Sequence, residues 1–181
     1  MTWRIVKFIS YLILAVFLVF FQTAFINALP LPWNQLNLVM VILFFVVLIV
    51  DYRFGLWATV VCGLISENYS PFIFGSIILS FLISIVVINF LFKLLFTNRS
   101  LFSLLILGGI GLMLYRLANL FYVYLGYIFN LDWHKIVVDA VYLSNLVWQL
   151  FFTLFGLLVV FLATRVLTKR FRSVFLVGGR R

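Results

Sequence analysis

Six long apolar runs, separated by short polar turns, account for almost the whole sequence. A helix needs about 20 apolar residues to cross a bilayer, and most of these runs reach that length. Only 9% of the residues are charged, whereas a soluble domain has about 25%. The sequence therefore predicts an all-α integral membrane protein with six transmembrane helices. The expected spans are residues 5–26, 35–50, 54–69, 71–92, 101–129 and 136–163.

The basic residues indicate the orientation of these spans. With the amino terminus in the cytoplasm, eleven basic residues fall in cytoplasmic segments, Lys135 alone falls in an outer loop, and Arg116 lies within a span. Lys and Arg concentrate on the cytoplasmic side of membrane proteins, so we expect both termini to be cytoplasmic. The excess of cytoplasmic basic residues accounts for the net charge of +9, so nucleic-acid binding is not needed to explain it. The eleven are Arg4, Lys7, Arg53, Lys93, Arg99, Arg165, Lys169, Arg170, Arg172, Arg180 and Arg181.

The third span is short. Its apolar core, residues 54–65, covers about 18 Å as a helix, against about 30 Å of hydrocarbon. Either the helix extends through Tyr69 with Glu67 at its outer end, or the segment is re-entrant and buried in protein. In both cases Glu67 lies near the outer interface. It is then either a solvated loop carboxylate or a cap for the fourth helix, whose amino end carries the positive pole of the helix dipole.

Polar side chains inside spans are costly and usually face protein or water. The fifth and sixth spans form an antiparallel hairpin about residues 131–133, which places Arg116 level with Gln149 and Asn119 level with Asn145. We therefore expect two stacked polar layers, which serve either as a ligand or partner site or as a clamp between the two helices. The polar residues within spans are Gln22, Asn89, Arg116, Asn119, Asp139, Asn145 and Gln149, of which Asp139 is nearest the outer face.

The segment 164–181 interleaves apolar and basic residues. We expect it to form an amphipathic cytoplasmic tail that lies on the inner leaflet and binds anionic lipid, at about 1 kcal/mol per basic residue. The alternative is that its charges only set the orientation of the protein. The basic residues expected to face lipid are Arg165, Lys169, Arg170 and Arg172.

Nothing in the sequence resembles a catalytic or cofactor site. The single cysteine, Cys62, permits no internal disulfide, and His134 with Asp132 does not complete a metal site. No phosphate-binding loop, nucleophile elbow, HExxH motif or dinucleotide fingerprint is present. We therefore expect no enzymatic activity and no cofactor. Three clustered glycines, Gly108, Gly109 and Gly111, are typical of a close helix contact or a kink.

The stretch 31–103 resembles the bacterial rod shape-determining protein family MreD. The shared features are a proline-bearing outer loop, a short third span with two glycines, a carboxylate four residues after the second glycine, and a small-residue loop before the fourth span. They are carried by Pro32, Asn37-Leu38-Val39, Tyr52-Arg53, Gly55, Gly63, Glu67, Gly75 and the basic turn 97–100. The family pattern has aspartate where this chain has Glu67.

The resemblance implies a non-enzymatic scaffold subunit of the rod-elongation machinery, in the inner (cytoplasmic) membrane of a bacterium. Its main partner would be an MreC-like protein, and the complex would connect an actin-like MreB filament inside the cell to peptidoglycan synthesis outside. An alternative is the substrate-binding membrane subunit of an energy-coupling-factor vitamin transporter, which has similar length, span number and basic charge. Those subunits carry an alanine-x-x-x-alanine pattern in their first helix, a spacing that Ala24 and Ala28 share at the outer end of the first run.

Overall fold

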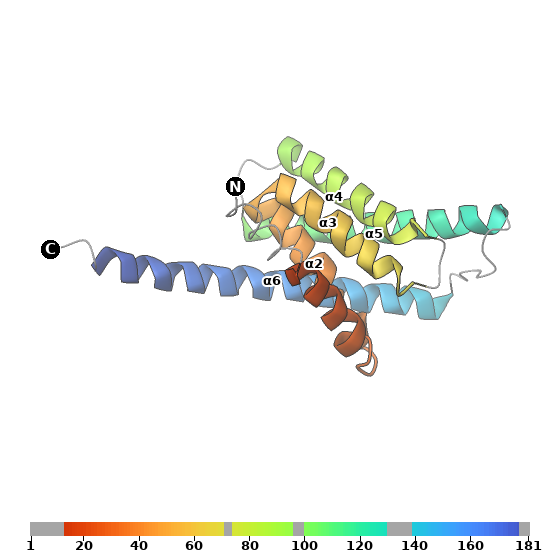
Figure 1. The fold of residues 1–181 in the computed structure, drawn as a ribbon, viewed down its shortest axis with the longest axis horizontal. Helices are drawn as coiled ribbons and strands as arrows, with labels where there is room; N and C mark the ends of the chain where they lie inside the picture. Colours follow the sequence, from red (N-terminus) through yellow and green to blue (C-terminus); the bar gives the residue numbers. More distant parts are fainter. Residues whose placement is uncertain (1–12, 71–73, 96–99, 130–138, 178–181) are drawn as a thin grey trace.

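The computed structural model describes residues 13–70, 74–95, 100–129 and 139–177. All regular structure in these ranges is helical (Figure 1). The amino-terminal helix, Ile13–Ile26, ends in a π-helical turn, η1 (Gln22–Ile26). The remaining elements are the 3₁₀ turn η2 (Trp33–Gln35), α2 (Leu38–Phe45), the π-helical η3 (Val46–Val50), α3 (Tyr52–Glu67), α4 (Ser76–Leu95), α5 (Leu101–Ile128) and α6 (Ala140–Val177).

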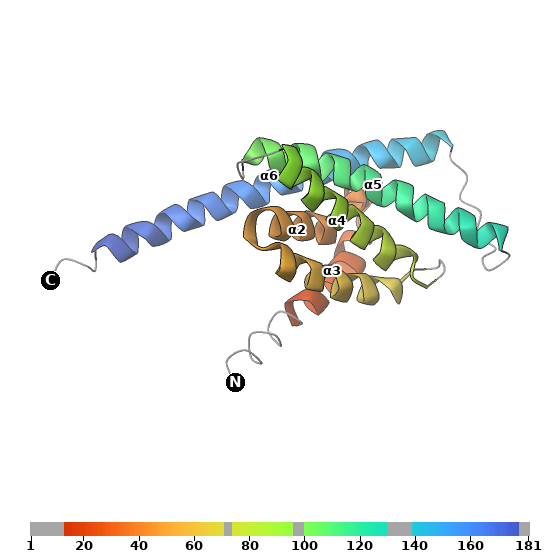
Figure 2. The same cartoon turned by 90° about the horizontal axis from the view of Figure 1, so that it is seen from above.

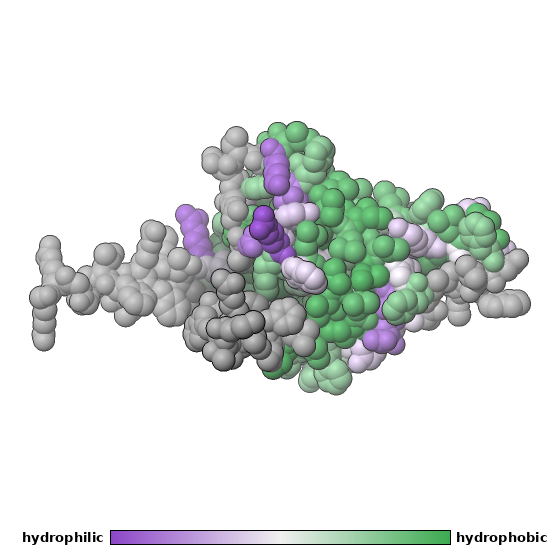
Figure 3. Space-filling view, turned by 45° about the horizontal axis from the view of Figure 1, so that its top comes forward, coloured by the Kyte–Doolittle hydropathy of each residue, from purple (hydrophilic) through white to green (hydrophobic). Residues whose placement is uncertain are grey.

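Three helical segments are long and apolar enough to cross a bilayer: α4, α5 and the part Ala140–Val166 of α6. Two shorter apolar helices, Ile13–Ile26 and Leu38–Ile49, accompany them. Most of the face drawn in Figure 3 is apolar, and its few hydrophilic residues lie toward two sides of the apolar area. Length, composition and surface together indicate a membrane protein.

Helix α2 lies at the centre of the bundle, in contact with α3, α5 and α6 (Figures 1 and 2). Its side chains are buried on all sides; Val41 is fully buried, and Met40 and Phe44 are each 1% exposed. A helix that is apolar all round is stable only when surrounded by protein or lipid. This arrangement explains why α2 carries no polar face.

The segment expected to form the short third span is one continuous helix. Helix α3 has 16 residues, or about 24 Å, and it ends at Glu67, two residues before the expected end at Tyr69. Helix α3 starts at Tyr52, two residues before the expected boundary. The connection between η3 and α3 is a single residue, Asp51. The Asp51 carboxylate accepts hydrogen bonds from the backbone N–H groups of Arg53 and Phe54, both at 3.4 Å. Gly55 allows the close return, since a Cβ there would lie 2.2 Å from Cγ2 of Val47.

Several span boundaries differ from those expected. The second helical segment begins at Leu38 rather than at residue 35, because Asn37 caps it by accepting from the N–H of Met40 at 3.0 Å. Helix α4 covers Ser76–Leu95 rather than 71–92, and residues 71–73 lie outside the described ranges. The start of the first expected span, residues 5–12, also lies outside them.

Helix α6 continues through the expected boundary between the last span and the tail. It runs from Ala140 to Val177 without interruption, and its carboxyl-terminal part extends away from the other helices instead of turning aside (Figures 1 and 2). No glycine or proline occurs between Gly156 and Gly178, so nothing in the backbone ends the helix earlier. Arg165 is exposed; the side chains of Lys169, Arg170 and Arg172 lie outside the described part of the protein.

Two of the three clustered glycines make close helix contacts, as predicted. A Cβ on Gly111 would lie 2.2 Å from Cδ1 of Ile88 in α4, and one on Gly108 would lie 2.3 Å from Cδ1 of Leu157 in α6. Ser84 of α4 adds a hydrogen bond of 2.6 Å to the carbonyl oxygen of Gly111. Helix α5 is therefore held closely on two sides by small residues.

Candidate functional site

Glu67 caps α4. One carboxylate oxygen accepts from the N–H of Gly75 at 2.9 Å, from the hydroxyl of Ser76 at 3.4 Å and from the N–H of Ile77 at 3.3 Å. The other oxygen accepts from the N–H of Ile78 at 3.0 Å. The side chain is only 4% exposed, so it is not the solvated loop carboxylate of the alternative interpretation. The expected cap is present.

The surroundings of Glu67 explain how a carboxylate is tolerated in a buried position. The first N–H groups of a helix have no partner within the helix and carry partial positive charge. Glu67 supplies acceptors for several of them at once. Gly75 adopts φ +101°, a conformation that favours glycine, and its N–H joins the same carboxylate. The contact fixes the end of α3 to the beginning of α4.

Arg116 and Gln149 form the first of the expected polar layers. The Nε–H of Arg116 donates to Oε1 of Gln149 at 2.5 Å, and Gln149 is 5% exposed. The guanidinium carbon also lies 5.8 Å from the centre of the Tyr142 ring, within cation–π range. This contact joins α5 to α6.

The second expected layer is not formed. Asn119 and Asn145 are half-buried, and no hydrogen bond connects them within the described ranges. Helices α5 and α6 approach closely at Gly108 and cross (Figure 2), so this pair lies further from the close contact than Arg116 does. Asp139 is exposed and caps α6 by accepting from the N–H of Tyr142 at 2.9 Å.

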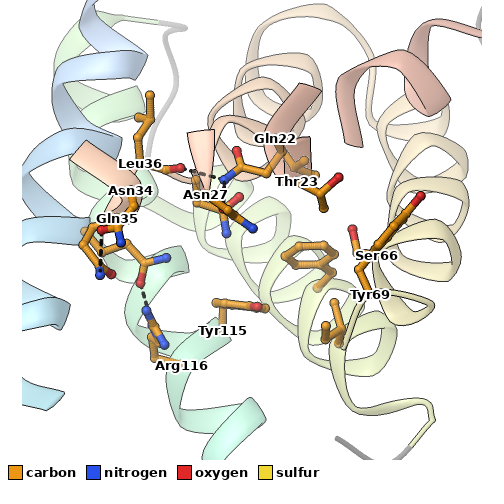
Figure 4. A pocket seen from close by; sticks show the side chains of 15 residues that line it. Gln22, Thr23, Asn27, Asn34, Gln35, Leu36, Ser66, Tyr69, Tyr115 and Arg116 are labelled. Carbon is orange, nitrogen blue, oxygen red and sulfur yellow. Dashed lines mark hydrogen bonds between the residues drawn. The ribbon is translucent and has the colours of Figure 1, made fainter. Parts of the chain in front are cut away.

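Arg116 also lines a polar cavity of about 250 Å³. The cavity lies where the helix Ile13–Ile26 and α3 end and where α4 begins (Figure 4). The rings of Phe81 and Tyr115 stack at 4.9 Å, so the turn of α5 that carries Arg116 lies beside the second turn of α4. The lining residues are Gln22, Thr23, Asn27, Asn34, Gln35, Leu36, Asn37, Val39, Ser66, Tyr69, Ile77, Phe81, Tyr115, Arg116 and Gln149.

Gln22 holds the loop that forms one wall of the cavity. Its Nε2 donates to the carbonyl oxygen of Leu36 at 2.8 Å and to Oδ1 of Asn27 at 3.1 Å, and its Oε1 accepts from the N–H of Leu38 at 2.7 Å. In Figure 4 these contacts connect the end of the first helix to the segment before α2. The in-span amide that the sequence indicated at Gln22 is thus a structural clamp. Asn89, by contrast, is buried in α4 away from this cavity.

The lining of the cavity is polar, with a single positive charge. Its neutral polar groups are side-chain amides and hydroxyls, beside the apolar side chains of Leu36, Val39, Ile77 and Phe81. Among the described residues that line it, Arg116 is the one charged group and none is acidic. Such a lining suits a small polar or anionic ligand. The carboxylates of Glu67 and Asp139 are both engaged as helix caps, and the described residues contain no cluster of three or more His, Cys, Asp or Glu that could hold a metal ion.

Sequence reasoning located Arg116, Gln149 and Gln22 but did not connect them with one another through a cavity. The sequence signal that could have indicated the cavity is the group of amides at Asn34, Gln35 and Asn37, which lie within four residues of one another in a turn. Cys62 is buried in the hydrophobic core, as expected for ordinary packing.

Comparison with known proteins adds no relative to this description. The chain matches no protein-family model, no curated protein and no solved structure.

Proposed function

We propose that this protein is a non-enzymatic scaffold subunit of the bacterial rod-elongation machinery, of the MreD type, that binds an MreC-like partner through its helix surfaces. The observation that carries the proposal is structural. Several residues that resemble the MreD pattern, Asn37, Gly55, Gly63, Glu67 and Gly75, have a definite physical task in the unit formed by α2, α3 and the start of α4.

The tasks within this unit depend on one another. Asn37 caps α2, and Gly55 and Gly63 allow α3 to approach its neighbours. A Cβ on Gly63 would lie 3.0 Å from the Cα of Ile78, next to the N–H groups that Glu67 caps. Gly75 then turns the chain so that its own N–H meets Glu67. Gly63, Glu67 and Gly75 thus act at one helix junction, and this supports the proposal.

The proposed topology has six spans, with both termini in the cytoplasm and the protein in the inner membrane. The distribution of eleven basic residues against Lys135 supports it. In this orientation the turn between α3 and α4, with Glu67 and the cavity, faces outward. The extended end of α6, which carries Arg165, then enters the cytoplasm on the side of the anionic inner leaflet.

The partner surface is proposed to be the face of α6 that points away from the other helices. Only 22% of the spanning part of α6 is buried, against 33% for α4 and for α5, so α6 is the least covered of the three. Its exposed side chains include large apolar residues, Val147, Phe151 and Phe155. Apolar surfaces of this kind pack against a neighbouring transmembrane helix by close van der Waals contact.

The transporter interpretation is a second candidate, and the polar cavity is the observation that favours it. A vitamin-capturing subunit needs a ligand pocket near the outer surface, and this cavity has that place in the proposed topology. Its volume of about 250 Å³ lies below the roughly 300–1,000 Å³ of pockets that enclose drug-sized ligands. A vitamin carried through purification would favour this candidate.

Affinity purification of the full chain in mild detergent tests the proposal. We expect an MreC-like protein and other cell-wall elongation proteins among the recovered partners. Replacing Val147, Phe151 and Phe155 of α6 with alanine should reduce their recovery several-fold. The matched control replaces three exposed residues of α4, Val86, Phe90 and Leu94, and should leave recovery unchanged. Recovery of a bound vitamin without any cell-wall protein would count against the scaffold and for the transporter.

A further inference from the structure

We propose that the cavity beside Arg116 is a binding site for a phosphate ester, either the headgroup of a membrane lipid or a small soluble molecule. This goes beyond the scaffold role and does not depend on it. Three features of the cavity carry the inference: an incompletely paired guanidinium, a set of neutral hydrogen-bond donors, and a location at the ends of the membrane helices.

The guanidinium of Arg116 has donors to spare. Arginine carries five N–H groups, and only the one on Nε has an acceptor among the described residues, Oε1 of Gln149. The side chain is half-buried, and no described carboxylate pairs with it. A partly buried cation without an anion is unfavourable. The two terminal nitrogens form a planar fork, which matches the oxygens of a phosphate in a bidentate arrangement.

Neutral donors surround the same space. The Oε1 atom of Gln149 is committed to Arg116, which leaves the Nε2 donor of this amide for a ligand. Asn34 accepts from Nε2 of Gln35 at 3.1 Å through Oδ1, which likewise leaves its Nδ2 donor. The phenol groups of Tyr69 and Tyr115 also belong to the lining. A phosphate ester has enough acceptor oxygens to use several of these donors at once, and none of the described lining residues is acidic.

The size and position of the cavity narrow the ligand further. A volume of about 250 Å³ equals that of roughly eight water molecules, which is enough for a group of the size of glycerol phosphate. The cavity lies at the ends of the helix Ile13–Ile26 and of α3, as Figure 4 shows. In the proposed topology these helix ends lie at the level of the lipid headgroups, and the cavity extends from there to Arg116 within α5 and Gln149 within α6. The π-helical turn η1, which supplies Gln22 and Thr23, is a feature that often accompanies functional sites.

The test uses the full chain, purified in neutral detergent, with two probes. Binding of glycerol 3-phosphate is measured by equilibrium dialysis, and retention of phosphatidylglycerol by native mass spectrometry. We expect Arg116→Gln to weaken binding by about tenfold or more, as loss of charge-assisted hydrogen bonds implies. Arg116→Lys keeps the charge without the fork and should give a smaller loss. The control Arg53→Gln removes the same charge from an exposed site outside the cavity and should leave binding unchanged.

The two probes distinguish the sources of the ligand. Retention of phosphatidylglycerol without binding of glycerol 3-phosphate identifies a lipid headgroup, and binding of glycerol 3-phosphate identifies a soluble ester. Either result supports the proposal if Arg116→Gln abolishes or weakens binding of that probe. A second variant, Asn34→Leu, keeps the guanidinium and removes one donor, so it should weaken binding about threefold or more.

The proposal is overturned if the wild-type protein binds neither probe. It is also overturned if binding is the same in Arg116→Gln as in the wild type or, should Arg116→Gln not fold, if Asn34→Leu binds as well as the wild type. None of these results affects the co-purification of cell-wall proteins. Failure of the phosphate site and failure of the scaffold proposal are therefore separable.

Discussion

Replacing Glu67 with alanine is expected to lower the free energy of unfolding by about 3 kcal/mol. The change removes the acceptor for the N–H groups of Gly75, Ile77 and Ile78 and for the hydroxyl of Ser76. The site is 4% exposed, so water cannot replace the carboxylate without rearrangement of the turn. Hydrogen bonds to a charged group are each stronger than bonds between neutral groups, and the helix dipole adds to the loss.

Unfolding of the purified protein in mixed micelles, followed by circular dichroism, measures this effect. Glu67→Asp retains the charge on a shorter side chain and should lose less stability than Glu67→Ala. The control is Asp139→Ala, which removes another helix-capping carboxylate, but an exposed one with a single such hydrogen bond; it should cost about 1 kcal/mol or less. Equal stability of Glu67→Ala and Asp139→Ala would show that Glu67 does not hold α3 to α4.

Replacing Gly111 with alanine is expected to be the second most damaging change, at about 1–3 kcal/mol. The added Cβ would lie 2.2 Å from Cδ1 of Ile88 and 2.8 Å from Cζ of Phe44. Ile88 is fully buried and Phe44 is 1% exposed, so neither side chain has free space into which it can move. Helix α5 must therefore shift away from α4 and α2, which also strains the hydrogen bond from Ser84 to the Gly111 carbonyl.

Gly109 provides the matched control for Gly111 on the same helix. Its added Cβ would find Cδ2 of Leu154 at 3.9 Å, an ordinary van der Waals distance. Alanine favours helix over glycine by about 1 kcal/mol, so Gly109→Ala should leave the thermal unfolding temperature in detergent unchanged or slightly raised. If Gly111→Ala unfolded at the same temperature as Gly109→Ala, the close contact between α4 and α5 would not matter for stability.

Features that depend on neighbouring residues were predictable from the sequence. Apolar runs predicted helices at the right places, because a chain with so few polar groups must satisfy its backbone internally. The contact between Arg116 and Gln149 followed from the depth of each residue in a helical hairpin. The cap by Glu67 was one of the two roles that the sequence left open for a carboxylate between two closely spaced helices.

Features that depend on the crossing of helices were not predictable. Asn119 and Asn145 share the depth arithmetic of Arg116 and Gln149, but the crossing of α5 and α6 leaves their short amides unbonded to each other. The cavity combines side chains from the first helix, from the loop before α2 and from each of the helices α2 to α6. No pattern along the chain encodes such a meeting. The continuation of α6 beyond Ala163 was not predicted, because the composition changes there from apolar to basic. Such a change moves a helix from an apolar to an aqueous environment but does not end it.

Depletion of this protein in the cells that encode it is the most direct test of the proposed role in rod elongation. Cell width and the position of new peptidoglycan are followed by microscopy as the protein is removed. The account predicts that rods widen and become round, that new wall material is no longer inserted along the side wall, and that the wild-type gene restores both. Cells that keep their width and side-wall synthesis after complete depletion would contradict it.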